Sequence, residues 1–209
     1  MTAPVARATN AIALLTCAAF ALSLLSGRGD ALDLMAGFIP ARLLGVQIPD
    51  ALPLWVTPLT ATLLHGGGLH LGFNMLILLF CGRMVEAVLG WRGALLLYIL
   101  GGYAAAFGQY LLDPASLSPM IGASGAISAL FGAYALLFSK PRLLIDQPQL
   151  AVLINIIWLA VAWVGVQFLM GFAFSDMGMA IAVGAHIGGF IAGLAVTPAL
   201  VALRARQVG

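Results

Sequence analysis

Residues 120–138 read MIGASGAISALFGAYALLF, an apolar run with small residues at regular intervals. A helix needs about 20 largely apolar residues to cross a bilayer, and this stretch has that length and composition. Ser124, Ser128 and Gly132 recur at a spacing of four, so they share one helix face. A face of small residues lets a second helix approach closely. The stretch therefore predicts a membrane span that packs against a neighbouring span.

The whole chain has the composition of a membrane protein. Of its 209 residues, 63% are hydrophobic and 8% are charged, against about a quarter charged in a soluble domain. The formal net charge of +2 is too small to indicate a nucleic-acid partner. Cys17 and Cys81 both fall in apolar segments, which argues against a disulfide framework, and so few Cys and His argue against a zinc cluster. We expect neither a metal nor a cofactor.

Six segments are long and apolar enough to cross a bilayer, which predicts an all-α membrane protein with a six-helix bundle. These segments cover residues 9–27, 69–88, 92–112, 120–138, 150–172 and 178–202. The connection over residues 28–68 contains several prolines and many apolar residues, so we expect an outer loop that dips into the membrane interface. We predict a single polytopic membrane domain over residues 1–209.

The basic residues gather on one side of the predicted spans. With an even number of spans both termini share that side, and of the nine Lys and Arg residues only Arg28 and Arg42 fall on the other. Because positive charge favours the cytoplasmic side, we expect cytoplasmic termini. At the inner end of the second span, Arg83 and Glu86 are expected to anchor the interface through a salt bridge.

The first segment has an alternative interpretation as a cleaved signal peptide, because Arg7 precedes an apolar stretch of signal-like length. No small-x-small cleavage site stands close behind it, which favours a membrane span. The small size and the lack of a transit segment indicate a multi-pass protein of a bacterial inner membrane.

Spans two, four and six carry polar side chains near their outer ends. Polar groups inside a bilayer are costly, so their placement is the main functional signal. The three spans run in the same direction and bring His70, Asn74, Ser124 and His186 to a similar depth. Ser124 lies about four residues and His186 about eight residues into its span, roughly 6 to 12 Å below the outer surface. We therefore expect these side chains to meet.

A second face of small residues lies beside His186 in the sixth span. Ala185, Gly189 and Gly193 recur at the same spacing of four as the small residues around Ser124. Two such faces allow close backbone approach. The pattern predicts that the fourth and sixth spans pack together.

These residue types suit acyl transfer. A serine becomes a useful nucleophile when a base lies within hydrogen-bond reach, and histidine has a suitable pKa. Ser124 and His186 would form a dyad, because the carboxylates fall in loops or at span ends. His70 and Asn74 stand at i and i+4 on one helix face, and both can donate to an oxyanion. Backbone N–H groups in the turn 122–125 could add further donors.

Each signal also has a non-catalytic interpretation. The glycines and serine can serve packing alone, His186 can be structural or ion-linked, and Asn74 can bridge two helices. The joint occurrence at one depth favours catalysis. Two other functions stay open: a catalytically silent protein that binds membrane helices, and a small-solute transporter or channel. The absence of an intramembrane acid and of paired interrupted spans disfavours transport.

Together these residues resemble the rhomboid family of intramembrane serine proteases, and the resemblance covers about residues 55–195. The matching stretches are LLHGGGLHLGFNMLILLFCGRMVEAVLG (63–90), GASG (122–125) with Gly132 beyond it, and AHIGGFIAG (185–193). The resemblance implies a six-helix bundle in which Ser124 is the nucleophile and His186 is the general base and acid. It implies that His70 and Asn74 form part of the oxyanion hole.

The resemblance also implies the substrates and a cover for the site. Substrates would be single-span membrane proteins, cleaved at small residues in or near the outer end of a helix that unwinds easily. The loop between the fifth and sixth spans would cap a water-filled cavity. The chain departs from the family pattern twice: Trp55 is followed by Val56 where an Arg is frequent, and Ser128 stands where many members carry an aromatic residue.

Overall fold

The computed structural model describes residues 6–138, 147–174 and 182–208, and most of these residues are helical. The longer elements are α1 (Arg7–Ser26), α4 (Gly68–Ile77), the π-helical turn η3 (Leu78–Gly82), α5 (Arg83–Leu112), α6 (Ser124–Phe138), α7 (Pro148–Phe174) and α8 (Val183–Val208). Apart from one antiparallel bridge between Phe38 and Met120, the described residues contain no β-structure. The prediction of an all-α protein is confirmed.

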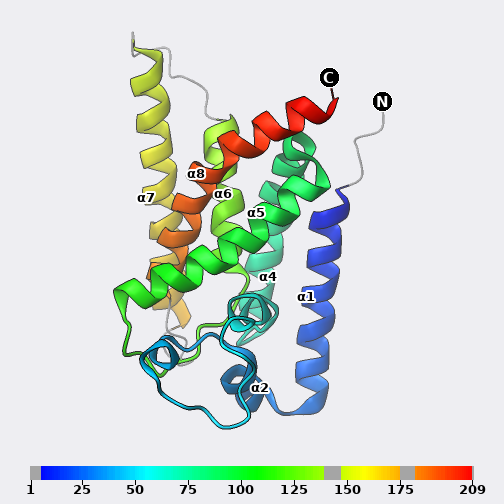
Figure 1. Cartoon of the computed structure of the whole chain (residues 1–209), viewed down its shortest axis with the longest axis vertical. Coiled ribbons are helices and arrows are strands. Elements are labelled where there is room, and N and C mark those ends of the chain that lie inside the picture. The colour runs from blue at the N-terminus through cyan, green and yellow to red at the C-terminus, as the bar shows by residue number, and fades with distance from the viewer. Residues whose placement is uncertain (1–5, 139–146, 175–181, 209) are drawn as a thin grey trace.

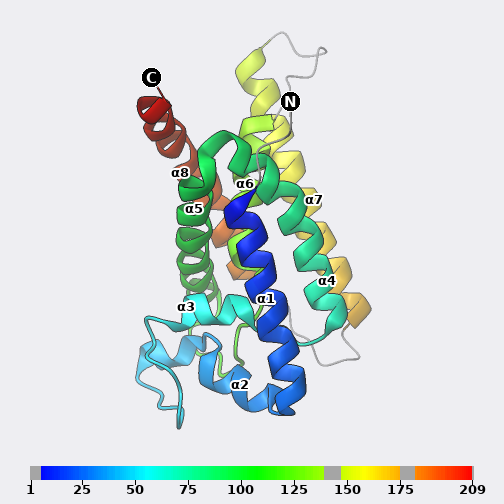
Figure 2. The same cartoon turned by 90° about the vertical axis from the view of Figure 1, so that its right-hand side faces the viewer.

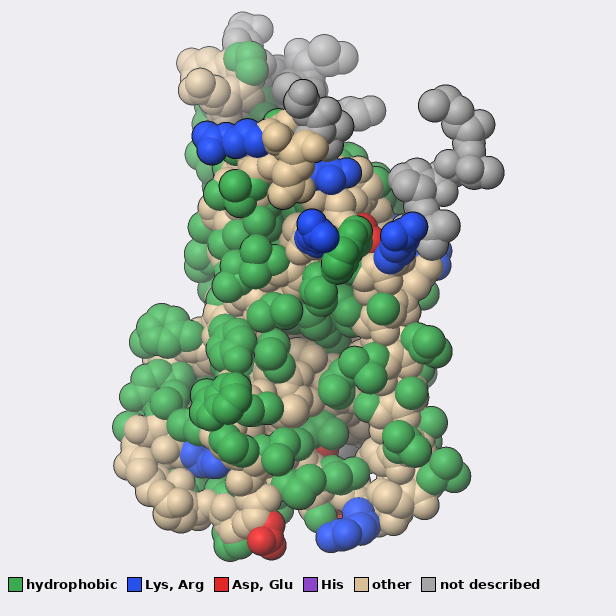
Figure 3. Space-filling view, turned by 45° about the vertical axis from the view of Figure 1, so that its right-hand side comes forward, with side chains coloured by type: hydrophobic (Ala, Val, Ile, Leu, Met, Phe, Trp, Pro, Cys, Tyr) green, Lys and Arg blue, Asp and Glu red, His purple; other side chains and the backbone are tan. Residues whose placement is uncertain are grey.

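Four helical runs of the described residues are long and apolar enough to cross a membrane: 7–26, 68–112, 148–166 and 183–207. The helix α6 is apolar but shorter. Figure 3 shows a broad band of hydrophobic side chains around the middle of the molecule, with Lys, Arg, Asp and Glu gathered toward the two ends. This distribution is the one expected of helices in a bilayer.

The run Gly68–Leu112 turns back on itself at Gly90. The residue has φ 73° and ψ 166°, outside the helical range, and glycine adopts positive φ at no steric cost. Figures 1 and 2 show α4 approaching this turn and α5 leaving it in the opposite direction. The starts of α4, α6 and α8 lie toward one end of the bundle, and the last turns of α8 lie at the other (Figure 1).

Glycines at the contact between α6 and α8 allow the two helix backbones to approach closely. A Cβ atom at Gly189 would overlap the carbonyl oxygen of Gly125, and one at Gly193 would overlap that of Ala129. Gly132 lies in the same way against the backbone of Phe190. The predicted contact between the two faces of small residues is confirmed.

The helix α5 packs against both α6 and α8, a contact that the spacing of small residues in α6 and α8 does not predict. A Cβ atom at Gly101 would contact Ala126 and Ala129 of α6, and one at Gly108 would lie 3.0 Å from the Cα of Gly188. Three helices rather than two therefore share the closely packed core.

We expect Gly189→Ala to destabilise the protein, because the new Cβ would overlap the Gly125 carbonyl oxygen and lie 3.1 Å from the Ser128 Cβ. Overpacking of this kind costs about 1 to 3 kcal/mol. Gly165→Ala in α7 is the matched control, since nothing lies within 4 Å of its Cβ position. The control should be neutral or stabilising by up to about 1 kcal/mol. Thermal unfolding in detergent measures both variants, and equal transition temperatures would contradict the packing.

The connection over residues 28–68 is more ordered than the predicted loop. It contains α2 (Gly29–Ala36), the 3-10 turns η1 (Pro40–Leu44) and η2 (Ala61–Leu63), and α3 (Thr57–Thr60). Figure 2 shows α2 and α3 beneath the long helices. Phe38 exchanges two backbone hydrogen bonds with Met120, and the Gly122 N–H donates to the Ala61 carbonyl at 2.9 Å. This segment therefore supports the chain immediately before α6.

The prediction of a salt bridge between Arg83 and Glu86 is wrong, because each side chain has other partners. Glu86 is buried and accepts hydrogen bonds from the Ala8 N–H at 3.0 Å, the Thr9 N–H at 2.8 Å and the Thr9 hydroxyl at 2.7 Å. The carboxylate thus satisfies free amides in the first turn of α1. Arg83 donates to the Asn10 side-chain oxygen at 3.2 Å instead.

Some residues on which two of the predictions depend lie outside the described ranges. Lys140 and Arg142, which contribute to the charge count, fall in residues 139–146. The loop expected to cap the site falls largely in residues 175–181.

Candidate active site

Ser124 and His186 lie in the first turns of their helices. The helix α6 begins at Ser124 and α8 at Val183, so both residues lie nearer to their helix starts than the expected four and eight residues. Residues before Ser124 cannot continue the helix, because Met120 pairs with Phe38 and Gly122 has φ 112°. The expected helix start at residue 120 is therefore wrong.

The Ser124 Oγ lies 2.8 Å from the His186 Nε2, within hydrogen-bond distance. His186 is 5% exposed, and its Nδ1 is buried with no hydrogen-bond partner among the described residues. When Nδ1 carries the proton, Nε2 is free to accept the hydroxyl proton of Ser124. The pair then has the geometry of a serine beside a general base.

The close approach of α6 and α8 makes this contact possible. Gly125 follows Ser124, and a Cβ atom there would lie 3.6 Å from the Ala185 Cβ. Gly189, one turn after Ala185, lies against the carbonyl of the same Gly125. Side chains at these positions would force the two helices apart and carry His186 away from the serine.

His70 of α4 borders the same space as the serine. A Cβ atom at Gly122 would lie 2.7 Å from the His70 Nε2 and 3.7 Å from the Ser124 Oγ. The absence of a side chain at Gly122 therefore leaves room between the imidazole and the hydroxyl. The Nδ1 of His70 is buried without a hydrogen-bond partner among the described residues.

Asn74 is buried one turn beyond His70. Its side-chain amide donates to the His70 carbonyl at 2.9 Å. An Asn amide has two N–H donors, so one of them stays available for another acceptor.

The backbone amides of the turn before α6 are only partly available as donors. The Gly122 N–H donates to the Ala61 carbonyl at 2.9 Å, and the Ala123 N–H points to the His65 Nε2 at 3.5 Å. The amides of Ser124 and Gly125 begin α6 and have no partner in the part of the chain that the structure describes. Of the donors predicted in this turn, these two remain.

His65 has a larger part in this region than the sequence indicates. It is buried, and its ring centroid lies 4.8 Å from that of His70. Burial, followed by the nearby His70, lowers the pKa of His65 to about 3. The ring is therefore neutral at pH 7, and its Nε2 can accept the hydrogen bond from Ala123.

Trp163 is a further residue of this region that the sequence pattern does not indicate. Its indole N–H donates to the Ser128 Oγ at 2.9 Å, and the Ser128 hydroxyl donates to the Ser124 carbonyl at 2.8 Å. The indole also stacks on Phe131 with ring centroids 4.7 Å apart. Ser128 thus connects α7 to the backbone of Ser124. The long apolar stretch of α7 gives no signal that would single out this tryptophan.

Comparison with known proteins gives one family. The model of the Rhomboid domain matches residues 54–203. The putative rhomboid protease YdcA of Bacillus subtilis (strain 168) is 32% identical over 137 residues, which are 66% of this chain and 65% of the relative. The rhomboid protease GluP of the same organism is 33% identical over 144 residues, or 68% of this chain and 26% of the relative.

A third relative is the rhomboid protease GlpG of Yersinia pestis (strain Pestoides F). It is 30% identical over 132 residues, which are 63% of this chain and 43% of the relative. The matched part is thus about two thirds of the length of YdcA and about a quarter of the length of GluP.

Proposed function

The chain belongs to the rhomboid family of integral membrane proteins, and on that premise we propose that it is an intramembrane serine endopeptidase with Ser124 and His186 as its catalytic dyad. The observation that carries the proposal is the 2.8 Å contact between the Ser124 Oγ and the His186 Nε2. Three relatives named as rhomboid proteases support the same reaction class.

In the proposed reaction, the His186 Nε2 takes the Ser124 hydroxyl proton while the Oγ attacks the carbonyl carbon of the scissile peptide bond. The resulting tetrahedral intermediate collapses, the C–N bond breaks, and His186 gives its proton to the leaving amine. A water molecule then loses a proton to His186 and attacks the acyl ester. The acid product leaves, and Ser124 recovers its proton.

The oxyanion of each tetrahedral intermediate needs hydrogen-bond donors. We assign this role to the His70 side chain and to the free amide proton of Asn74, together with the Ser124 N–H. The supporting observations are the position of His70 beside Gly122 and the free amide at the start of α6. For His70 to donate toward Ser124, its Nε2 must carry the proton.

A labelling experiment tests the serine directly. A fluorophosphonate forms a covalent bond with an activated serine, so purified protein should be labelled and Ser124→Ala should not. Ser118→Ala is the matched control, because Ser118 is an exposed serine just before the turn. Equal labelling of Ser124→Ala and the parental protein would reject the dyad. Absence of labelling in the folded parental protein would favour the catalytically silent alternative.

We further propose that the single domain crosses the membrane six times, with both termini in the cytoplasm. The turn at Gly90 divides the run Gly68–Leu112 into two antiparallel parts, which supports this count. Single cysteines at Asp113 and Gly209, in a variant without Cys17 and Cys81, should react with impermeant reagents from opposite sides of a bacterial inner membrane. Reaction of both from outside would contradict the orientation.

The proposed substrates are single-span membrane proteins whose outer helix end unwinds easily. A peptide bond inside a membrane helix has its amide hydrogen-bonded, so the helix must open before the serine can attack. Replacing Gly or Pro in the outer third of a substrate span by Leu should therefore slow cleavage in a vesicle assay. Unchanged cleavage of several such substrates would show that helix opening is not required.

A further inference from the structure

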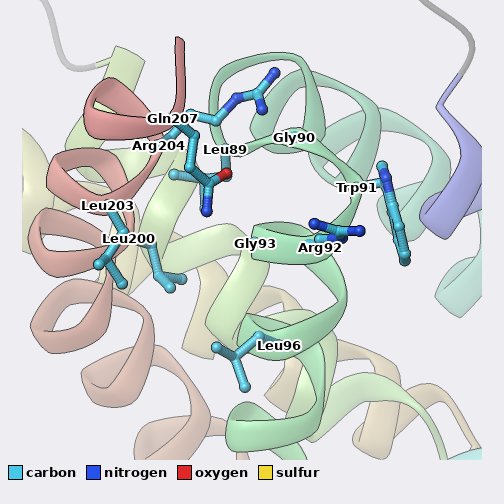
Figure 4. A pocket seen from close by; sticks show the side chains of 10 residues that line it. All are labelled: Leu89, Gly90, Trp91, Arg92, Gly93, Leu96, Leu200, Leu203, Arg204 and Gln207. Carbon is cyan, nitrogen blue, oxygen red and sulfur yellow. The ribbon is translucent and has the colours of Figure 1, made fainter. Parts of the chain in front are cut away.

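A pocket of about 210 Å³ lies between the turn at Gly90 and the last turns of α8 (Figure 4). It is at the end of the bundle opposite the starts of α6 and α8, and so far from Ser124 and His186 (Figure 1). Trp91 and Arg92 line it from α5, and Leu200 and Arg204 line it from α8. The proposed hydrolysis makes no use of these residues.

The pocket carries two guanidinium groups and no acidic lining residue. The Arg204 guanidinium lies against Gly90, with its Cζ 3.2 Å from the position of a Cβ atom there. The Arg92 Cζ lies 5.2 Å from the centroid of the Trp91 ring. Within the described residues, neither guanidinium forms an ion pair or a hydrogen bond. Both are thus free to bind an anion, and planar guanidinium groups match the oxygens of phosphate.

Apart from Gln207, the remaining lining is apolar, and part of it is exposed. Leu96 is 44% exposed and Trp91 is 46% exposed. Figure 4 shows Leu96 further along α5 than Arg92, on the side away from the turn at Gly90. A ligand that fills this pocket therefore meets positive charge at the end of the bundle and apolar side chains toward its middle. Tryptophan is enriched at the headgroup level of membranes.

We propose that this pocket binds the phosphate diester headgroup of an anionic phospholipid, with an acyl chain against Leu96 and Leu203, a lining residue of α8 that is 51% exposed. A soluble phosphate would use only the two arginines, whereas a lipid also covers the exposed apolar lining. Basic pockets between membrane helices are suited to lipid headgroups. The inference concerns lipid binding alone, and it stands whether or not the protein hydrolyses peptide bonds.

The test uses the full chain in nanodiscs of phosphatidylcholine that contain a small fraction of spin-labelled phosphatidylglycerol. Electron paramagnetic resonance measures the fraction of labelled lipid immobilised on the protein, with spin-labelled phosphatidylcholine as the reference. Arg92→Gln and Arg204→Gln should each weaken the preference for phosphatidylglycerol about fivefold, and the double variant about thirtyfold. Arg92 and Arg204 are exposed, as is Arg206, the control residue. Their variants should therefore keep the parental thermal transition.

Arg206→Gln is the matched control, because Arg206 is an exposed residue of α8 that does not line the pocket. It should change the preference by less than about twofold. Equal losses in Arg206→Gln and Arg204→Gln would show diffuse attraction to the whole surface and overturn the proposal. Displacement of the labelled lipid by millimolar glycerol phosphate would show a site for soluble anions and would also overturn it.

Discussion

Ser124→Ala and His186→Ala should each reduce cleavage to below detection, and the double variant should be no slower than either single variant. The two side chains act on one chemical path, so the loss of one removes the contribution of the other. In a soluble serine protease, losses of this kind reach about a millionfold in turnover. The contact of 2.8 Å between the Ser124 Oγ and the His186 Nε2 is the structural basis for this expectation.

The measurement is cleavage of a single-span reporter by protein reconstituted in vesicles. Ser118→Ala should cleave at the parental rate, since this exposed serine lies outside the candidate site. Each variant must keep the parental thermal transition in detergent, so that lost activity reports chemistry and not unfolding. If a folded Ser124→Ala protein cleaved at the parental rate, Ser124 would not be the nucleophile. Its role would then be that of a small residue in the contact between two helices.

His70→Ala and Asn74→Ala should lower the rate of turnover without abolishing it. Loss of one oxyanion donor costs about 2.7 to 4 kcal/mol of transition-state stabilisation, which is roughly a hundredfold to a thousandfold in turnover. Neither variant removes the Ser124 hydroxyl or its base. Both should therefore still be labelled by a fluorophosphonate, although more slowly than the parental protein.

A matched control for the oxyanion variants is Leu69→Ala, a residue of α4 that is 59% exposed. It should cleave close to the parental rate. Asn74→Ala also removes the hydrogen bond from Asn74 to the His70 carbonyl, so its thermal transition must be compared with that of His70→Ala. If both variants retained parental turnover, donors other than these two side chains would stabilise the oxyanion.

The class of protein and several of its contacts can be predicted from local patterns. Apolar composition and segment length predict an all-α membrane protein, because a bilayer leaves no water for unpaired backbone groups. Small residues at a spacing of four predict that α6 and α8 pack together, because helical periodicity sets which residues share a face. The resemblance carried by residues 63–90, 122–125 and 185–193 predicts the family, which the Rhomboid domain match confirms.

The start of α6 could not be predicted from the sequence in the same way. Residues 120–123 are as apolar as the helix that follows, so hydropathy alone extends the span to residue 120. Their non-helical path depends on Met120 pairing with Phe38 and on the Gly122 N–H bonding to the Ala61 carbonyl. Both partners lie about 60 to 80 residues earlier in the chain, beyond the reach of helical periodicity.

The partners of some charged and aromatic residues likewise could not be predicted from local sequence. Glu86 and Arg83 are one turn apart and of opposite charge, which favours a local salt bridge. In the folded protein, the start of α1 offers Glu86 three donors instead. Trp163 likewise has its hydrogen-bond partner Ser128 on another helix.

Sequence periodicity thus accounts for the helical class, the small-residue faces and the residue types available for acyl transfer, because each depends on neighbours within a few turns. The distance between the Ser124 Oγ and the His186 Nε2, the space beside Gly122 and the supports from Ala61, His65 and Trp163 depend on how distant segments pack. Such contacts arise when buried polar groups find partners across the bundle, and hydropathy carries no information about which partner is reached.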